Sequence, residues 1–329
     1  MIKLKGHTKG VLSVVFNDDG MLASSSIDKT IKLWDISTMN CVGTLEGHTS
    51  YVWSVAFNGN GRMLASGSMD KTIKLWDIST MNCIKTLKGH TDGVKSVAFN
   101  GVGMLVSGGY DKTIKVWDIS TMTCMRTLKG HWGTVWSVAL NGDGMMLASG
   151  SSDKTIKLWD ISTMNCKGTL EGHTSTVYSV AFNGNGRMLA SASDDYTIKI
   201  WDISTKNCIK TLEGHTDWVW SVAFNDDRML ASGSENNTIK LWDISTMKCV
   251  MTLEDHTLSV LSVAFNGNGL LASGSLDRKI NLTRIYTKKF VNTALLTMNR
   301  RGLVDDVIDN IMEKLGVIDE KGKITGCVF

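Results

Sequence analysis

Hydrophobic and polar positions alternate along most of this chain in short runs that polar turns separate. In the stretch 47–88, residues 52–57 read Val-Trp-Ser-Val-Ala-Phe, and an Asn-Gly-Asn-Gly turn follows at 58–61. Period-two alternation is typical of strands, and Asn-Gly favours a tight hairpin. The pattern predicts four short antiparallel strands in this stretch, at 52–57, 63–68, 72–77 and 83–88.

The same pattern recurs through most of the chain. Each copy carries one histidine, and successive histidines lie 41 or 42 residues apart: His7, His48, His90, His131, His173, His215 and His256. The copies therefore begin near residues 6, 47, 89, 130, 172, 214 and 255. Self-similarity at this period indicates a solenoid or a propeller.

Two motifs carry a resemblance to a known family. The first motif is Gly-His at the start of the copies. The second, at 64–77 in the second copy, ends with the predicted third strand and reads Leu-Ala-Ser-Gly-Ser-x-Asp-Lys-Thr-Ile-Lys-Leu-Trp-Asp. Together they resemble the WD-repeat β-propeller family, which has four strands per blade. The resemblance implies an all-β fold, a single seven-bladed β-propeller over 1–294. The remainder, 295–329, is expected to be a tail with an amphipathic helix near 303–315, where apolar residues recur at helical spacing.

In this family the repeat histidine bonds to an aspartate of a turn, and a strand serine and the repeat tryptophan complete the network. Carried onto the second and third copies, these structural tetrads are His48, Ser66, Asp70, Trp76 and His90, Ser107, Asp111, Trp117. The sixth copy has Asn236 in place of the aspartate, and the seventh has Thr283 in place of the tryptophan. These two blades are therefore expected to be the softer ones.

Composition narrows the class of protein. The net charge is +3 and 20% of the residues are charged, which favours neither nucleic acid nor membrane surfaces as partners. No apolar run is long enough to span a membrane, and the N-terminus lacks the apolar core of a signal peptide.

Six of the seven cysteines recur at one repeat position, the start of the last strand, where they are predicted to be half-buried and too far apart for disulfides. Free thiols favour a reducing compartment, the cytoplasm or alternatively the nucleus.

The histidines argue against catalysis. All seven are repeat histidines, so none is left over as a general base beside a nucleophile. The glycines fit hairpin turns, and neither a phosphate-binding loop nor Cys-x-x-Cys spacing occurs. The sequence predicts a protein that is not an enzyme and that needs no cofactor and no metal.

Function is expected where the copies differ, which is just after Gly-His and just before the turn aspartate. Because the histidine and that aspartate meet, both regions fall on one face of the ring, the top face. The candidate binding residues there are Tyr51, Trp53, Lys95, Tyr110, Trp132, Trp136, Tyr178, Asp194, Trp218, Trp220 and Glu235. Exposed aromatic clusters mark interaction sites, and tryptophan and tyrosine dominate binding energy at interfaces.

The resulting hypothesis is a scaffold, monomeric within a larger complex, that binds peptide segments of other proteins. Arg or Lys of such a segment would lie between aromatic walls. The alternative interpretation of the tryptophans is that they fill gaps between blades.

Two further interpretations remain open. The residue after the turn aspartate is basic in five copies, namely Lys29, Lys71, Lys112, Lys154 and Arg278, and this lysine band could meet phosphates of RNA or acidic lipid. Near-identical copies could also record recent duplication with little binding specificity.

The last strand of the seventh blade has two candidates, the N-terminal residues 1–5 and a C-terminal segment ending at 290–294. The C-terminal segment preserves more of the repeat and is favoured.

Overall fold

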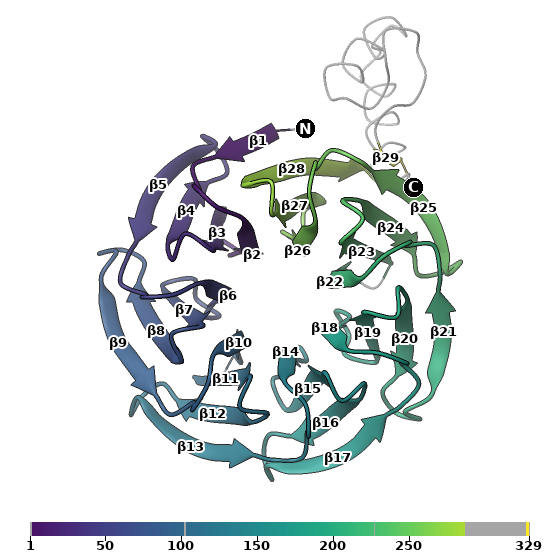
Figure 1. Cartoon of the computed structure of the whole chain (residues 1–329), viewed down its shortest axis with the longest axis horizontal. Coiled ribbons are helices and arrows are strands. Elements are labelled where there is room, and N and C mark those ends of the chain that lie inside the picture. The colour runs from purple at the N-terminus through teal and green to yellow at the C-terminus, as the bar shows by residue number, and fades with distance from the viewer. Residues whose placement is uncertain (1, 102, 227, 287–326, 329) are drawn as a thin grey trace, which may run out of the picture.

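The strands of this protein form seven blades arranged in a ring (Figure 1). The computed structural model describes residues 2–101, 103–226, 228–286 and 327–328. Each of the first six blades is a four-stranded antiparallel sheet whose strands follow one another in chain order. The seven-bladed propeller and the four strands per blade expected from the sequence are confirmed.

The first blade contains β2 (Val11–Phe16), β3 (Met21–Ser26), β4 (Ile31–Asp35) and β5 (Asn40–Leu45). The second contains β6 (Val52–Phe57), β7 (Met63–Ser68), β8 (Thr72–Asp77) and β9 (Cys83–Lys88). The third contains β10 (Val94–Phe99), β11 (Met104–Gly109), β12 (Ile114–Asp118) and β13 (Thr123–Leu128). All four strands of the second blade have the bounds that the hydrophobic pattern predicts.

The fourth blade contains β14 (Val135–Leu140), β15 (Met146–Ser151), β16 (Ile156–Asp160) and β17 (Asn165–Leu170). The fifth contains β18 (Val177–Phe182), β19 (Met188–Ser193), β20 (Ile198–Asp202) and β21 (Cys208–Leu212). The sixth contains β22 (Val219–Asn225), β23 (Met229–Ser234), β24 (Ile239–Asp243) and β25 (Lys248–Leu253). The seventh contains β26 (Val260–Phe265), β27 (Leu270–Ser275) and β28 (Lys279–Tyr286), and its fourth strand is β1 (Ile2–Lys5).

The N-terminal strand closes the ring, so the preference for a C-terminal closing segment was wrong. β1 runs antiparallel to β28, with Ile2 opposite Leu282 and Lys5 opposite Lys279 (Figure 1). Leu4 of this strand points inward, where only 4% of its surface is exposed, whereas Ile2 at the start of the strand is 44% exposed. A short strand β29 (Cys327–Val328) pairs in parallel with Ile285 and Tyr286 of β28. Residues 290–294 lie outside the described residues.

The hydrophobic core lies between neighbouring blades. One cluster joins Leu33 and Leu45 of the first blade to Val52, Leu64 and Trp76 of the second. Across the closure, a cluster joins Leu4 and Leu282 to Val14 and Trp34 of the first blade. A blade therefore cannot bury its apolar faces alone, and the closed ring is the stable unit.

Hydrogen bonds between the innermost strands also tie the blades together. The backbone N–H of Val97 donates to Ser54 Oγ at 3.1 Å, and the same bond crosses the closure from Val14 to Ser262 at 3.0 Å. The strand has a bulge just before this serine: in the second blade Val52 pairs with Ser68 and Ser54 with Gly67, so Trp53 between them has no partner in the sheet. These bonds hold the innermost strands, and hence the top face, in a fixed arrangement.

No helix occurs in the part of the chain that the structure describes, so none there is long and apolar enough to cross a membrane. The amphipathic helix expected near 303–315 and the rest of the tail up to residue 326 lie outside the described residues.

Candidate functional site

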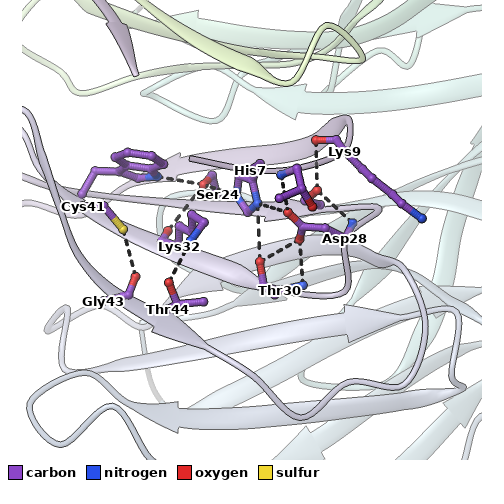
Figure 2. A network of polar contacts seen from close by, with 12 residues as sticks. His7, Lys9, Ser24, Asp28, Thr30, Lys32, Cys41, Gly43 and Thr44 are labelled. Carbon is purple, nitrogen blue, oxygen red and sulfur yellow. Dashed lines mark hydrogen bonds and ion pairs between the residues drawn. The ribbon is translucent and has the colours of Figure 1, made fainter. Parts of the chain in front are cut away.

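A network of polar side chains ties the top of each blade together, as Figure 2 shows for the first blade. There His7 Nδ1 lies 2.8 Å from Asp28 and His7 Nε2 lies 2.8 Å from Ser24 Oγ. The indole N–H of Trp34 donates to the same serine oxygen at 2.8 Å. These four groups come from β3, β4, the turn between them and the loop before β2, so the network fixes where the top loops leave the blade.

The residues predicted as tetrads of the second and third copies lie within hydrogen-bond distance of one another. His48 Nδ1 lies 2.7 Å from Asp70 and its Nε2 lies 2.8 Å from Ser66, which also accepts from Trp76 at 2.8 Å. In the third blade the His90–Asp111, His90–Ser107 and Trp117–Ser107 distances are 2.8, 2.7 and 2.9 Å.

The turn aspartate accepts several hydrogen bonds at once. Asp70 accepts from the hydroxyl and backbone N–H of Thr72 and from the backbone N–H of Thr49, besides its contact with His48. Burial by itself raises the pKa of this carboxyl, but the hydrogen bonds with His48 and Thr72 outweigh it and hold the pKa well below its usual range. The charged aspartate therefore anchors the turn that borders the top face.

The sixth and seventh blades have incomplete networks, as the sequence indicates. In the sixth, His215 keeps its contact with Ser232 at 2.7 Å, while Asn236 donates to Thr216 at 3.0 Å. Burial, together with the charge of Lys240, lowers the pKa of His215 to about 3, against the opposing effect of Asn236. In the seventh, His256 contacts Asp277 and Ser273, and Thr283 supplies no indole.

The divergent positions of all seven copies meet in one cavity at the top of the ring, which we call the top cavity. Its volume is about 270 Å³. The second residue of the innermost strand of every blade lines it: Leu12, Trp53, Lys95, Trp136, Tyr178, Trp220 and Leu261. Residues that precede the turn aspartate complete the wall: Ile27, Glu235 and Leu276. Leucine and isoleucine thus form the side at blades seven and one, and aromatic residues form the rest.

The aromatic rings of the top cavity pack against one another. The ring of Trp136 lies 4.9 Å from that of Tyr178 and 6.1 Å from that of Trp220, measured between centroids. Tyr178 and Trp220 are stacked at 4.2 Å with an angle of 29° between their planes. Tyr110 and Trp53 contact Trp136 from the other side, at 6.0 and 6.5 Å. The tryptophans therefore fill gaps between blades and also line the cavity, so the two interpretations of these residues are compatible.

Lys95 is buried inside this aromatic cluster. Only 4% of its surface is exposed, and its Nζ lies 2.9 Å from the ring centroid of Trp53, 3.8 Å from that of Trp136 and 4.9 Å from that of Tyr110. Burial lowers the pKa of this amine to about 6, whereas the ring faces favour its charged form. The space between Trp53, Tyr110 and Trp136 is thus occupied by an amine of the protein itself.

The acidic side of the site lies at blades five and six. Glu235 accepts a hydrogen bond from Trp220 Nε1 at 2.6 Å, and Asp194 accepts one from the Ser175 hydroxyl at 2.6 Å. Burial, and then the charges of Asp194 and Glu235, raise the pKa of the Tyr178 hydroxyl. This half of the site is therefore suited to a positively charged group.

Five candidate binding residues do not line the top cavity: Tyr110 and Asp194, described above, and three exposed aromatic residues of the top face. Tyr51, Trp132 and Trp218 have 41%, 69% and 38% of their surface exposed. Trp218 contacts the rings of Tyr178 and Trp220 at 6.3 and 5.7 Å and so continues the aromatic cluster outward. We call these three the exposed rim.

Some residues at the top cavity are not among the candidate binding residues. Leu12, Ile27, Leu261 and Leu276 line the top cavity and share the repeat positions of the aromatic candidates, so that positional signal could have found them. Ser152 precedes the turn aspartate as Ile27 and Leu276 do, and it accepts a hydrogen bond from Trp136 Nε1 of the cavity wall at 2.7 Å. The burial of Lys95 had no signal, because the charge of a lysine favours exposure.

The lysine band lies in the turns that follow the tetrad aspartates. Each of its members has a left-handed backbone, with φ of 72° at Lys29, 70° at Lys71, 64° at Lys112, 70° at Lys154 and 70° at Arg278. Tyr196 and Asn237 occupy the same place with φ of 68°. The position is therefore defined by its backbone, and side chains of different charge occupy it.

The cysteines differ from expectation in one respect. Cys41, Cys83, Cys124, Cys166, Cys208 and Cys249 are free, as predicted, but they are exposed and not half-buried. They lie on the outermost strands, where no further strand covers them. Within the described residues, no group of three or more His, Cys, Asp or Glu is arranged to hold a metal ion.

The comparison with protein families agrees with this geometry. The model described as "WD domain, G-beta repeat" matches seven times, at residues 1–35, 39–77, 81–118, 122–160, 164–202, 206–243 and 247–283. The chain belongs to the WD40 family. As a WD40 protein it has the seven blades that the family's repeats build.

Individual relatives match over much shorter stretches. WD repeat-containing protein SL1-17 of Schistosoma mansoni is 40% identical over 63 residues, which are 19% of this chain and 21% of the relative. Nuclear distribution protein PAC1 of Coccidioides posadasii is 40% identical over 68 residues, 18% of this chain and 14% of the relative. WD repeat-containing protein 44 of Xenopus laevis is 39% identical over 56 residues, which are 17% of this chain and 6% of the relative. The similarity therefore covers about a fifth or less of these relatives' length and concerns the repeat alone.

Proposed function

We propose that this WD40 propeller is a non-catalytic scaffold that binds peptide segments of partner proteins on its top face. The observation that carries the proposal is the top cavity. The repeat positions that differ most between copies converge on it, whereas the lower loops repeat Asp-Ile-Ser-Thr-Met nearly unchanged. Divergence confined to one concave surface is expected when that surface recognises a partner.

The exposed rim supports a protein as the partner. Tyr51, Trp132 and Trp218 surround the cavity with accessible aromatic surface, and Trp and Tyr supply most of the binding energy at protein interfaces. The ring beneath them is rigid, so little conformational entropy would be lost from the scaffold on binding. Within this proposal, Arg or Lys of the partner would bind near Glu235 and Asp194, because the space between Trp53, Tyr110 and Trp136 holds Lys95.

The decisive experiment is a comparative pull-down from the native cell with three baits. The first is the wild type, and the second carries Tyr51→Ala, Trp132→Ala and Trp218→Ala, which remove the exposed rim. The third is the matched control with Ile84→Ala, Met125→Ala and Ile209→Ala, three apolar residues of the outer strands with 44%, 53% and 47% exposure. Thermal melts first establish that all three are folded.

A partner captured by the wild type and the control, and lost by the rim variant, would support the proposal. Equal capture by all three baits would contradict it and move the search to the perimeter. The exposed thiols are consistent with a reducing compartment, and we propose the cytoplasm as the place of this interaction.

A further inference from the structure

The wall of the top cavity contains two hydrogen-bond donors without an acceptor. Lys95 Nζ and Trp53 Nε1 are both buried, and neither has a hydrogen-bond partner among the described residues. The other two cavity tryptophans differ, because Trp136 donates to Ser152 and Trp220 donates to Glu235. The unsatisfied donors therefore belong to blades two and three only.

Leaving such groups buried is unfavourable. An ammonium carries three N–H donors, and the ring faces of Trp53 and Trp136 compensate part of its charge but accept no conventional hydrogen bond. Buried polar groups are nearly always hydrogen-bonded, and an exception calls for an explanation in terms of function or an absent ligand. An anionic partner would in addition favour the charged form of this buried amine.

The surroundings indicate what kind of anion would fit. Lys95 borders a cavity of about 270 Å³ whose wall at blades seven and one consists of Leu12, Ile27, Leu261 and Leu276. The one acidic group of the lining, Glu235, belongs to blade six and accepts a hydrogen bond from Trp220. The apolar wall would contact an apolar part of the ligand. Lys95 is the one basic residue among those that line the cavity, so the ligand would carry a single anionic group. Inorganic anions would leave the apolar wall unused, and a basic group at this end would meet the charge of Lys95.

We propose that the top cavity binds a carboxylate carried on an apolar body, and that Lys95 is the residue that recognises it. The inference deepens the proposed function and rests on it, since the cavity opens on the same top face. The carboxylate could belong to an acidic side chain of a partner peptide or to a small free acid. In either case the apolar part lies against blades seven and one.

The test uses pairs of probes that differ only in charge. One pair is 4-phenylbutyrate and 4-phenylbutyramide, and the other is the peptide acetyl-Ser-Leu-Glu-Leu-Ser-amide and its Gln counterpart. Binding to the full chain is followed by calorimetry, for the wild type, for Lys95→Met and for Lys85→Met. Lys85→Met is the matched control, because Lys85 is exposed on the outer strand β9.

We expect at least one acid to bind about tenfold or more tightly than its amide. A charge-assisted hydrogen bond between the carboxylate and Lys95 would contribute this much binding free energy. This preference should disappear in Lys95→Met and persist in Lys85→Met. Preference within the phenylbutyrate pair alone identifies a small acid as the ligand class, and preference within the peptide pair alone identifies an acidic side chain.

Three results would overturn the inference: neither acid binds, acid and amide bind equally, or the preference survives in Lys95→Met. Should Lys95→Met fail to fold, the wild type labelled with ¹⁵N-lysine gives the answer, because the Nζ resonance of Lys95 must move when the acid is added and not with its amide. Loss of a partner in the exposed-rim variant together with unchanged capture by Lys95→Met would leave the scaffold function standing and reject only the carboxylate.

Discussion

Gly89 lies directly against the indole of Trp117: a Cβ added at position 89 would stand 3.0 Å from Cη2 of that ring. The same contact recurs at Gly6 with Trp34 and at Gly130 with Trp159, at 2.9 and 3.0 Å. In the seventh blade Thr283 replaces the tryptophan, and there the residue before the histidine is Asp255. At these three glycines the tetrad indole leaves no room for a side chain. At Gly47, Gly172 and Gly214 the distances to the indole are 3.6, 3.4 and 3.6 Å, and there the backbone, with φ of 141°, 145° and 144°, favours glycine instead.

This contact predicts that Gly89→Ala destabilises the protein. The new methyl group would force the buried Trp117 ring from its place, and overpacking of this kind costs about 1–3 kcal/mol. Asp255→Ala is the control, because no indole faces that position and the free energy of unfolding should change by less than about 0.5 kcal/mol. Urea unfolding measures both, and equal effects would contradict the explanation.

Rebuilding the tetrad of the seventh blade is a second test of the same relationship. Thr283→Trp alone should destabilise, because its indole would meet the side chain of Asp255. Combined with Asp255→Gly, the new indole could donate to Ser273 as Trp117 donates to Ser107 at 2.9 Å. We expect a favourable coupling of about 1 kcal/mol or more in the double-mutant cycle. Additive effects of the two substitutions would show that the positions are independent.

Much of this fold was predictable, because period-two alternation and the repeated motifs act locally. The strands of the second blade, 52–57 through 83–88, follow from the hydrophobic pattern alone, and the His48 and His90 tetrads follow from repeat positions. Ring closure was not predictable from the repeat, because β1 and a C-terminal segment carry similar patterns and compete for one sheet edge. The deciding contact, Leu4 in the core between blades seven and one, is tertiary.

The candidate site shows the same division. The repeat places the divergent residues on one face, and ten of them, six of which are candidate binding residues, line one cavity. The repeat pattern could not indicate that Lys95 turns inward, because that depends on three rings from blades two, three and four meeting around its Nζ. Nor could it show that the six cysteines remain exposed, because alternation alone does not tell what covers an outermost strand.

The sixth blade should lose stability in mild acid, and Asn236→Asp should prevent this loss. The pKa of His215 is lowered to about 3 in the folded protein, whereas an unfolded histidine titrates near 6.5. Below about pH 6.5 the unfolded chain therefore binds a proton that the folded chain refuses. Stability is complete above that pH and falls toward pH 3 by up to about 1.4 kcal/mol per unit.

With aspartate at 236, the pair formed by His48 and Asp70 would be reproduced, and the charged imidazolium would be tolerated. Urea unfolding at pH 7.0 and pH 5.0 compares the wild type with Asn236→Asp, and the variant should show the smaller difference by roughly 1 kcal/mol or more. Asn237→Asp is the control, because it adds the same charge one residue away. If the two variants behave alike, net charge and not the tetrad is responsible.

The lysine band is predicted to be a feature of the turn rather than a phosphate site. Substituting Lys29, Lys71, Lys112 and Lys154 by Asn introduces the residue that Asn237 already places there at φ of 68°. Asparagine tolerates this left-handed region better than lysine, so the free energy of unfolding should stay the same or rise by about 1 kcal/mol.

Binding of single-stranded RNA and of phosphatidylserine vesicles should be weak and equal for the wild type and this fourfold variant. Salt-dependent binding that the variant loses would contradict the prediction and support the phosphate-ligand alternative. The substitution leaves the top cavity unchanged, so capture of a partner in the pull-down should also be unaffected.

Closure by β1 makes Leu4 more important than its place in a four-residue terminal strand suggests. Its side chain is 4% exposed and packs with Val14, Trp34 and Leu282 of the two blades that it joins. Leu4→Ala should lower the free energy of unfolding by about 2–4 kcal/mol, because the cavity left behind lies between blades held by side-chain packing. Ile2→Ala is the control, since Ile2 is 44% exposed on the same strand.

Hydrogen exchange should locate the effect of Leu4→Ala in β28, whose outer edge pairs with β1, and leave strands such as β16 in the fourth blade protected. Uniform loss of protection around the ring would show instead that the propeller opens as one cooperative unit.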